Sequence, residues 1–476
     1  MSKFNEKIKP ARELSYEGGE NYKKDVLEDW MNFLFSSKMD NSFYEGSREQ
    51  QARFMELTNL VIDKYGAEFA GKCAMFTRND LGMRSTAQFV AAMLNGQSFE
   101  RKRDFYKAFC HRPDDMSEIF AAVDMLGGKR SHSMVRGFAD YMSGLSEYNI
   151  MKYQMKGKRY NMYDLINIIH PKSDVIDDYM NGKLENADTW EVNISTGQDS
   201  WKNMVEGNRL GYLALVRNLN NILAEDVDDA WIKQHLVDQL INEVSIKKSL
   251  IFPYQIYTAY RNLKVQNFAV ITALDTAFRI ACGNMPKLEG NSVIMLDVSG
   301  SMEDRYGNKS NLTIKEVGAC YAAALYINGN CDFVKFGNRA KSATFKKACG
   351  PFQVIREMCE NDNCGYGTDI APAFSLISDK KYDRIFVVSD MQVMARQHTY
   401  WGDSTDGMCN YNNYCAAHGR AILYSFDLGN YADQIANPGN PDVHLMTALN
   451  DNVFKMLEYV ENGGKLHDYI NENYHF

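Results

Sequence analysis

The spacing of apolar residues changes once along this 476-residue chain, and the change limits what the chain can fold into. From about residue 22 to about residue 280, apolar residues recur at helical spacing, as in "RFMELTNLVIDKY", "STAQFVAAML" and "LGYLALVRNLNNIL". No strong strand candidate interrupts this region. The spacing predicts roughly a dozen or more short helices with short links, stacked as a solenoid or a ring, although no fixed repeat period is visible.

After residue 291 the apolar segments become short and rich in Val, Ile and Phe. "SVIMLD", "CDFVKFG", "RIFVVSD" and "AILYSFDLG" are separated from one another by helical or polar stretches. This pattern is typical of a buried parallel sheet with crossover helices. We therefore predict two domains, because the chain is too long for one compact core: a helical module over residues 1–285 and an α/β domain over residues 290–476.

The composition is that of a globular protein, with 45% hydrophobic and 24% charged residues. The formal net charge of −8, taken alone, argues against a nucleic-acid partner. A partner contacts a patch and not the whole surface, however, and residues 101–159 hold 12 Lys or Arg against 7 Asp or Glu. The local excess of positive charge keeps nucleic acid open as a partner.

The start "MSKFNEKIKPAREL" lacks the apolar core of a signal peptide, and no run of about 18 apolar residues could span a membrane. The ten cysteines include no CxxC motif, and the closest pairs, Cys359 with Cys364 and Cys409 with Cys415, lack zinc-site spacing. These features predict a soluble, cytoplasmic protein whose cysteines are mostly buried free thiols.

Polar residues follow the predicted strands at the edge where open α/β sheets bind ligands. In "VIMLDVSGSMED", Asp297 ends a strand, and Ser299 and Ser301 follow on the same side. "GYGTDIAPAF" supplies Thr368, and "FVVSDMQV" supplies Asp390. Carboxylate and hydroxyl oxygens suit Mg²⁺, so these five residues predict a magnesium site. Two carboxylates leave the ion undercharged, which opens a position for an external carboxylate or phosphate.

These five residues resemble the metal-ion-dependent adhesion site (MIDAS) of von Willebrand factor A domains, which has the same residue types in the same chain order. The resemblance implies a Rossmann-like domain with a mostly parallel sheet and a bound Mg²⁺. The structural alternative is a loop whose hydroxyls only cap the following turn. A catalytic serine is disfavoured because no histidine lies nearby and G-x-S-x-G is missing. A nucleotide site is disfavoured because there is no phosphate-binding loop with its Lys.

Three stretches of the helical half hold clustered cations with aromatic residues among them: "FTRNDLGMRS", "GGKRSHSMVRGFADYM" and "MKYQMKGKRYNMYDLINIIHPKS". Such clusters can bind phosphates while stacking unpaired RNA bases. The structural alternative for each stretch is a solvated helix face, and for His170 a helix cap. The candidate RNA-binding residues are Arg78, Arg84, Lys129, Arg130, His132, Arg136, Lys152, Lys156, Lys158, Arg159, His170 and Lys172.

The same stretches, together with "TWEVNISTGQDSWKNMVEGNRLGYLALVRNLNNIL" over residues 189–223, resemble the TROVE module of the Ro autoantigen family. Ro proteins join this module to a C-terminal von Willebrand factor A domain. The resemblance implies a ring of HEAT-like helical repeats that binds small noncoding Y RNAs outside and single-stranded ends of misfolded RNAs in its central hole. In bacteria, related proteins work with a 3′ exonuclease through a Y RNA tether.

The chain departs from the family in its acidic net charge, in its shorter loops and in a polar, aromatic insertion at residues 391–419. The insertion either shapes or covers the metal site or is a local surface loop. The departures leave the extent of the basic surface open.

The favoured hypothesis is an RNA-binding ribonucleoprotein scaffold in RNA quality control, without catalytic activity. The alternative is an adaptor that captures an acidic protein ligand through Mg²⁺. A metal-dependent hydrolase is least favoured, since nuclease sites usually cluster three or four carboxylates. Only Asp297 and Asp390 are well placed here, and Asp369 is expected to cap the following helix.

Overall fold

The computed structural model describes residues 12–14, 20–23, 26–36, 47–285, 287–306, 310–346, 349–392, 407–429, 433–435, 440, 442–446, 457 and 466–476. The chain forms two compact units. The helical unit comprises residues 33–37, 53–200 and 459–476, and the mixed unit comprises residues 1–32, 38–52 and 201–458. The units are defined by packing, so the division into domains 1–285 and 290–476 stays a prediction.

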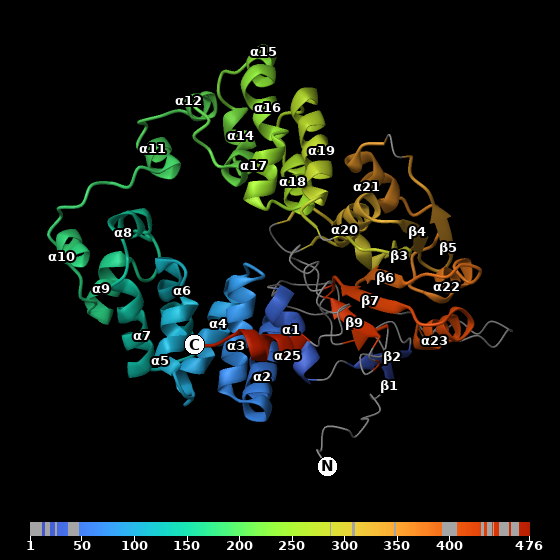
Figure 1. The fold of residues 1–476 in the computed structure, drawn as a ribbon, viewed down its shortest axis with the longest axis horizontal. Helices are drawn as coiled ribbons and strands as arrows, with labels where there is room; N and C mark the ends of the chain where they lie inside the picture. Colours follow the sequence, from blue (N-terminus) through green and yellow to red (C-terminus); the bar gives the residue numbers. More distant parts are fainter. Residues whose placement is uncertain are drawn as a thin grey trace. The chain divides into compact units, whose positions relative to one another are not determined.

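In the helical unit, consecutive helices lie side by side (Figure 1). Helices α1 (Val26–Ser36) and α2 (Ser47–Tyr65) contribute residues to both units. The other elements are α3 (Ala67–Asn79), α4 (Ser85–Met93), η2 (Leu94–Gly96), α5 (Lys102–Phe109), α6 (Pro113–Met125), α7 (His132–Met142), α8 (Glu147–Lys152), α9 (Met162–Ile169), α10 (Asp174–Met180), α11 (Trp190–Ser195) and α25 (Leu466–Asn473).

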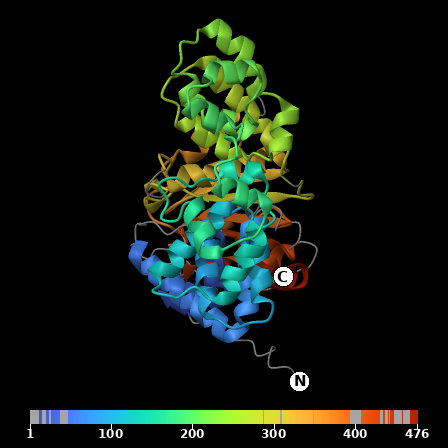
Figure 2. The ribbon, with the colours of Figure 1, turned by 90° about the vertical axis from the view of Figure 1, so that its left-hand side faces the viewer.

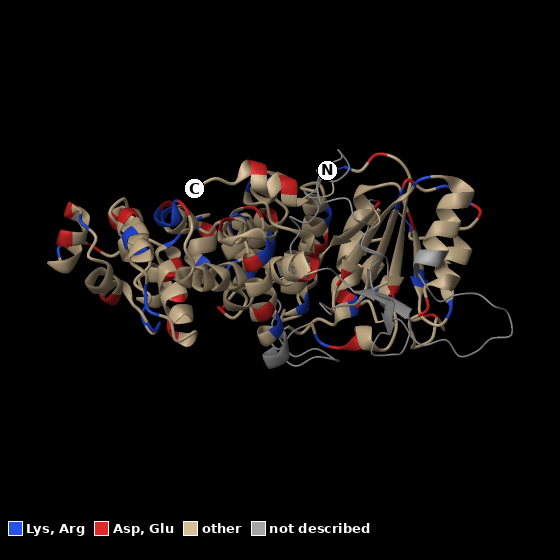
Figure 3. Ribbon diagram, turned by 90° about the horizontal axis from the view of Figure 1, so that it is seen from below, with Lys and Arg blue, Asp and Glu red and all other residues tan. Residues whose placement is uncertain are grey.

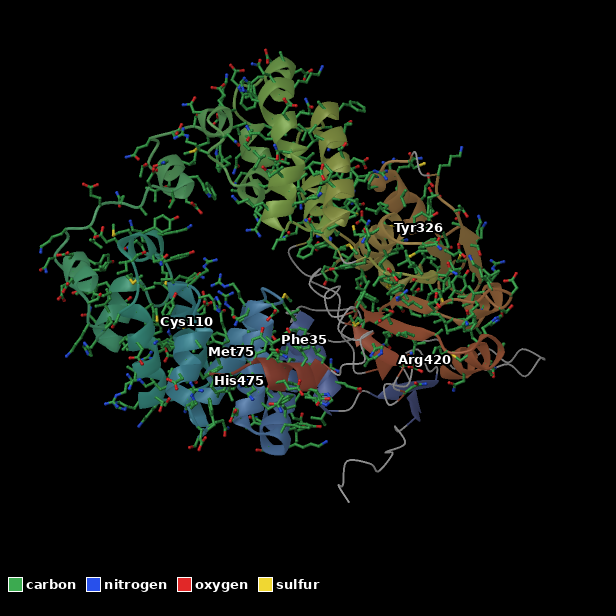
Figure 4. All side chains as sticks on the ribbon, in the orientation of Figure 1. Phe35, Met75, Cys110, Tyr326, Arg420 and His475 are labelled. Carbon is green, nitrogen blue, oxygen red and sulfur yellow. The ribbon has the colours of Figure 1, made fainter. Side chains whose placement is uncertain are left out.

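Helix α25 belongs to the helical unit although it lies far away in the sequence. The Lys72 ammonium on α3 donates to the Asn471 carbonyl at 3.1 Å. The Phe476 ring packs edge-on against Phe105 of α5, with 5.2 Å between ring centroids. Figure 4 labels Met75 on α3 and His475 beyond α25, from the two segments that meet here. The core of the helical unit is therefore closed by residues of the C-terminal segment.

Helices α5 and α7 cross at Gly137, where the backbones approach too closely for a side chain. A Cβ atom at this position would lie 2.8 Å from the Tyr106 Cβ and would also overlap the Arg103 carbonyl. Tyr106 is fully buried and its hydroxyl donates to the Ala91 carbonyl at 2.8 Å, so it cannot move aside cheaply. The crossing requires glycine.

The mixed unit combines a helical part with an α/β domain. Its helical part contains α12 (Trp201–Glu206), α13 (Tyr212–Arg217), α14 (Leu219–Ile222), α15 (Asp229–Trp231), the π-helical η3 (Ile232–Val237), α16 (Asp238–Leu240), α17 (Glu243–Ser249), α18 (Pro253–Arg261) and α19 (Phe268–Cys282). These helices form one group in both ribbon views (Figures 1 and 2).

The α/β domain is built on one six-stranded sheet in the order β5-β4-β3-β6-β7-β9. Neighbouring strands are parallel except for the edge pair β4 and β5. The strands are β3 (Ser292–Asp297), β4 (Cys331–Phe336), β5 (Ala340–Ala343), β6 (Arg384–Ser389), β7 (Ile422–Asp427) and β9 (Val443–Met446). The helices are η4 (Ser301–Glu303), α20 (Ile314–Asn328), α21 (Pro351–Cys359), α22 (Ala371–Leu376) and α23 (Gly407–His418). Every residue of β3 and β6 is buried, as their unbroken apolar sequences predict.

The helical part and the α/β domain of the mixed unit pack through α18 and α19. The Tyr260 ring of α18 stacks on Phe352 of α21, with 4.3 Å between centroids. The Arg261 guanidinium pairs with Glu316 of α20 at 2.9 Å, and the Tyr257 hydroxyl donates to the same carboxylate. Helix α18 is thereby held firmly against the α/β domain.

A second, small sheet was not expected from the sequence. Strand β2 (Glu20–Lys23) pairs antiparallel with β1 (Arg12–Leu14) and with β8 (Asp433–Gln434). Residues 20–23 therefore pack with the C-terminal half of the chain, although they precede a long helical region. Strands of two to four residues fall below the length at which periodicity can be recognised.

The structure confirms the predicted combination of a helical module with an α/β domain whose sheet is mostly parallel. Closure into a ring stays a prediction. The nine described cysteines are free thiols, and five of them are buried. Within the described ranges no helix is long and apolar enough to cross a membrane. Residues 393–406 of the predicted insertion lie outside the described residues, and residues 407–418 form α23.

We expect Gly137→Ala to destabilise the protein by about 1–3 kcal/mol, because the added methyl group overpacks the α5–α7 crossing. Chemical denaturation measures the change. The matched control is Gly96→Ala, since a Cβ atom at Gly96 meets no atom within 4 Å. Equal stability of the two variants would contradict the described crossing.

Candidate metal centre and nucleic-acid interface

Three neighbouring parallel strands end in acidic or hydroxyl side chains at one level of the sheet. Leu296 of β3 pairs with Val388 of β6, which places the next residues, Asp297 and Ser389, side by side. Ser389 pairs in turn with Asp427 of β7. Asp297 and Ser389 are fully buried and Asp427 is nearly so. The predicted metal edge of the sheet is thus a buried row of oxygen atoms.

Both oxygens of Asp297 are engaged by neighbouring groups. The Ser299 backbone N–H donates to Oδ1 at 2.8 Å, and the Ser389 hydroxyl donates to Oδ2 at 2.6 Å. The hydroxyl oxygens of Ser299 and Ser301 lie 3.5 Å apart. Burial raises the pKa of Asp297, and the Ser389 and Ser299 hydrogen bonds partly offset this effect.

Asp390 follows β6 directly and is fully buried. Its Oδ1 accepts a long 3.3 Å bond from the Gln392 N–H, whereas its Oδ2 has no hydrogen-bond partner within the described residues. Burial and the negative charge of Asp297 raise the pKa of Asp390 to about 7, against the effect of the Ser301 hydroxyl. A buried carboxylate with an unsatisfied oxygen is a place where a cation is stabilised.

The loop that carries Thr368 is tied to the Ser299–Ser301 loop. The Gly300 N–H donates to the Tyr366 carbonyl at 2.8 Å, and the Asn361 side-chain amide donates to the Val298 carbonyl at 2.9 Å. Thr368 itself is buried, two residues beyond Tyr366. Asp369 accepts from the N–H of Ala371, the first residue of α22, but the N-cap position itself is held by Ile370, one residue closer to the helix than the expected cap.

The five predicted ligands fit a hard divalent cation by their chemistry. No group of three or more His, Cys, Asp or Glu side chains that could hold a metal occurs among the described residues, so an ion here needs the hydroxyls as well. Sequence reasoning missed Ser389, Asp427 and Lys315. The positive charge of Lys315 lowers the pKa of Asp297. Ser389 and Asp427 end predicted strands and were detectable, but the Lys315 ion pair with Glu303 depends on tertiary structure.

The pH dependence of stability reports on the buried pair. A carboxyl whose pKa rises on folding stabilises the fold below its ordinary pKa, near 4, and this contribution is lost as the pH rises towards about 7. Without metal, we expect the wild-type protein to lose more stability between pH 5 and pH 8 than Asp390→Asn does. At pH 8, Mg²⁺ should raise the melting temperature of the wild-type protein more than that of the variant.

Thermal melts with chelator and with Mg²⁺ at both pH values test this prediction. Asp379→Asn removes an exposed carboxylate of the same domain and serves as the control, with wild-type behaviour expected. Identical pH profiles of wild-type protein and Asp390→Asn would contradict it.

The structure divides the predicted RNA-binding cations into two groups. In the first group the cation is buried or half-buried and is held in a structural ion pair. Arg78 is 8% exposed and binds both oxygens of Asp115, at 3.2 and 2.9 Å. Arg84 pairs with Asp114 at 2.8 Å. The Arg130 guanidinium lies between the Phe120 and Tyr160 rings, 4.6 and 4.9 Å from their centroids. Arg78 has the least access to solvent of the whole set.

The second group is exposed, and its members are Lys129, His132, Arg136, Lys156, Lys158, Arg159, His170 and Lys172. Lys158 and Arg159 pair with Glu118 and Asp124, whereas Lys152, half-buried, contacts the Tyr148 hydroxyl. His170 is the C-cap residue of α9 and takes a left-handed conformation, with φ of 53°. This agrees with the alternative interpretation of His170 as a helix cap. Lys and Arg are interspersed with Asp and Glu over the ribbon (Figure 3), so the basic surface is local.

Two of the three basic stretches meet at Asp124. Arg130 from the second stretch pairs with this carboxylate at 3.0 Å, and Arg159 from the third pairs with it at the same distance. The Tyr160 hydroxyl donates to it as well. Two basic stretches that lie about thirty residues apart in the sequence therefore form one surface in the structure.

We expect Arg78→Ala to cost about 3–5 kcal/mol of stability, because it removes the counterion that binds both oxygens of the buried Asp115 carboxylate and leaves only Arg84, 3.6 Å away. Arg136→Ala removes an exposed cation from the same unit and should change stability by less than about 0.5 kcal/mol. Denaturant titration of both variants gives the comparison. Equal losses of stability in the two variants would contradict the structural role assigned to Arg78.

Comparison with known proteins agrees with this organisation. Residues 178–269 match the family model of the TROVE domain. The fold resembles the crystal structure of the Ro (RSR) protein of Deinococcus radiodurans with a TM-score of 0.63 and 16% sequence identity, over 92% of this chain and 100% of that one. No curated protein matches the chain. The TROVE match contains the stretch 189–223 and confirms the resemblance predicted from it.

Proposed function

We propose that this chain, which carries a TROVE domain and has the fold of the Deinococcus Ro protein, is an RNA-binding protein of the Ro type. It binds small noncoding Y-like RNA and the single-stranded ends of misfolded RNA, as a scaffold in RNA quality control and without catalysis of its own. A 3′ exonuclease is a candidate partner. The observation that carries the proposal is the exposed basic surface at the start of α7, taken together with the TROVE match at residues 178–269.

The segment before α7 is held in one conformation. The Asn95 side chain donates to the Lys129 carbonyl and accepts from the Ser131 N–H, both at 2.8 Å. The Ser131 hydroxyl then caps α7 by accepting from the Met134 N–H. Lys129, His132 and Arg136 project from a rigid backbone, which lowers the entropy cost of binding phosphates.

Arg130 supports this surface from within. Its contacts with Phe120, Tyr160 and Asp124 fix it between α6 and the third basic stretch. We assign it a positioning role, in contrast to the exposed cations beside it. A test of RNA binding should therefore replace exposed cations and spare Arg130.

We expect Lys129→Ala, Arg136→Ala and Lys156→Ala, combined, to weaken binding of RNA with a single-stranded tail across sequences. Each lost phosphate contact should reduce the slope of log K against log salt by roughly 0.7, or about 2 for three contacts. Filter binding over a salt series measures both quantities. The control removes the same charge from exposed positions of the α/β domain, with Lys346→Ala, Arg356→Ala and Lys381→Ala.

An unchanged slope in the first triple variant would move the RNA site elsewhere. Absence of RNA binding by the wild-type protein at low salt would refute the proposed function as a whole.

A second function is favoured by the unsatisfied Oδ2 of Asp390. We propose that Asp297, Ser299, Ser301, Thr368 and Asp390 hold Mg²⁺ and that the domain thereby docks an acidic protein ligand. When bound, the ion supplies positive charge and an open position for an external carboxylate. Capture of that ligand should vanish with chelator or with Asp297→Ala, whereas RNA binding should survive both treatments. A hydrolase stays least favoured because the carboxylates are too few.

A further inference from the structure

We propose that a groove between α13, α14 and α18 binds one unpaired nucleotide of the RNA, with its base inside and its phosphate at Arg217. The inference rests on the proposed function and adds a specific site to it. The groove has a volume of about 330 Å³ and lies wholly in the mixed unit, whereas the basic surface at α7 belongs to the helical unit. Volumes of this size accommodate small ligands.

The walls of the groove suit the flat faces of a base. Leu213 and Val216 of α13, Ile251 and Ala259 supply apolar surface, and Tyr254 supplies an aromatic ring. The Tyr254 ring lies nearly parallel to Tyr321 of the α/β domain, 6.2 Å between centroids and 7° between planes. An aromatic ring in a fixed orientation is the usual platform for an unpaired base.

The charge of the groove suits a phosphate. Arg217 is the one charged residue of its lining, and no Asp or Glu lines it. The guanidinium is exposed and makes no ion pair within the described part of the chain. This contrasts with a larger cavity on the helical unit, about 670 Å³, in which Asp104 and Asp140 lie among the cations. A negatively charged ligand therefore fits the groove with Arg217 better than the cavity with Asp104 and Asp140.

Among the described residues, the Gln255 side chain offers the groove an amide nitrogen that makes no hydrogen bond. Asn220 donates to the Asn262 carbonyl and accepts from the Lys264 N–H, so both ends of its amide are used. Gln255 accepts from the Phe252 N–H through Oε1, and its Nε2 makes no hydrogen bond with the described residues. The Nε2 group can donate to a base carbonyl or ring nitrogen.

The groove is preformed because its α18 wall is fixed from behind. Tyr257, Tyr260 and Arg261 of α18 do not line the groove but contact Phe352 and Glu316 of the α/β domain. Binding therefore needs little reorganisation of the protein.

Photocrosslinking tests the location directly. A ten-nucleotide single-stranded RNA containing 4-thiouridine, irradiated with the full chain, should crosslink to the peptide that contains Tyr254 and Gln255. Excess unmodified RNA should suppress the crosslink. Crosslinks confined to other peptides would overturn the proposal.

Fluorescence anisotropy with the same RNA tests the contribution to affinity. Ala259→Trp fills the groove and should weaken binding by about fivefold or more, the loss expected for one stacked base. Arg217→Ala should weaken binding and reduce the salt slope by roughly 0.7. The controls are Ala259→Ser, which keeps the groove open, and Lys248→Ala, which removes an exposed cation from α17.

The outcomes separate the groove from the proposed function. If both Ala259→Trp and Arg217→Ala bind the RNA with wild-type affinity, the groove is not a nucleotide site. The proposed RNA-binding function would still stand. Failure of the wild-type protein to bind either this RNA or a structured RNA refutes the proposed function. Because Arg217 is exposed, its variant keeps the test valid if Ala259→Trp melts at a lower temperature than the wild-type protein.

Discussion

A carboxylate that is buried must be balanced by hydrogen bonds or by positive charge, and both units of this protein are organised around that requirement. In the helical unit, Asp115 accepts bonds from Arg78, from Gln88 and from the N–H groups of His111 and Arg112. Burial alone would raise its pKa, but these donors and the Arg78 charge lower it. The balance is complete within the protein.

At the sheet edge the same requirement is met only in part. Asp297 is satisfied by Ser299 and Ser389, but the neighbouring Asp390 keeps one oxygen without a donor in the described structure, and its pKa is raised. A site that folds with its charge unbalanced stays ready for an ion that balances it. The contrast between Asp115 and Asp390 separates a structural carboxylate from a functional one.

Much of the fold could be predicted from the sequence because it depends on local patterns. The unbroken apolar sequences of β3 and β6 signal a buried parallel sheet, and the strand ends then locate Asp297 and Asp390. The roles of the arginines could not be predicted, because Arg78 and Arg136 differ only in what the fold places next to them. Arg78 meets Asp115, 37 residues away, whereas Arg136 stays at the surface. Strand β2 was missed for a similar reason, since its partner β8 lies about 410 positions later.

The contact between α3 and the C-terminal segment has a consequence for the order of folding. Lys72 and Asn471 are separated by 399 positions, and residues 201–458 of the mixed unit lie in the sequence between residues 53–200 and residues 459–476 of the helical unit. During synthesis, α3 and α5 leave the ribosome long before the residues that cover them. Closing so long a loop is slow, and apolar surface such as Phe105 stays uncovered in the meantime. The helical unit can therefore complete its core only after the α/β domain has been synthesised.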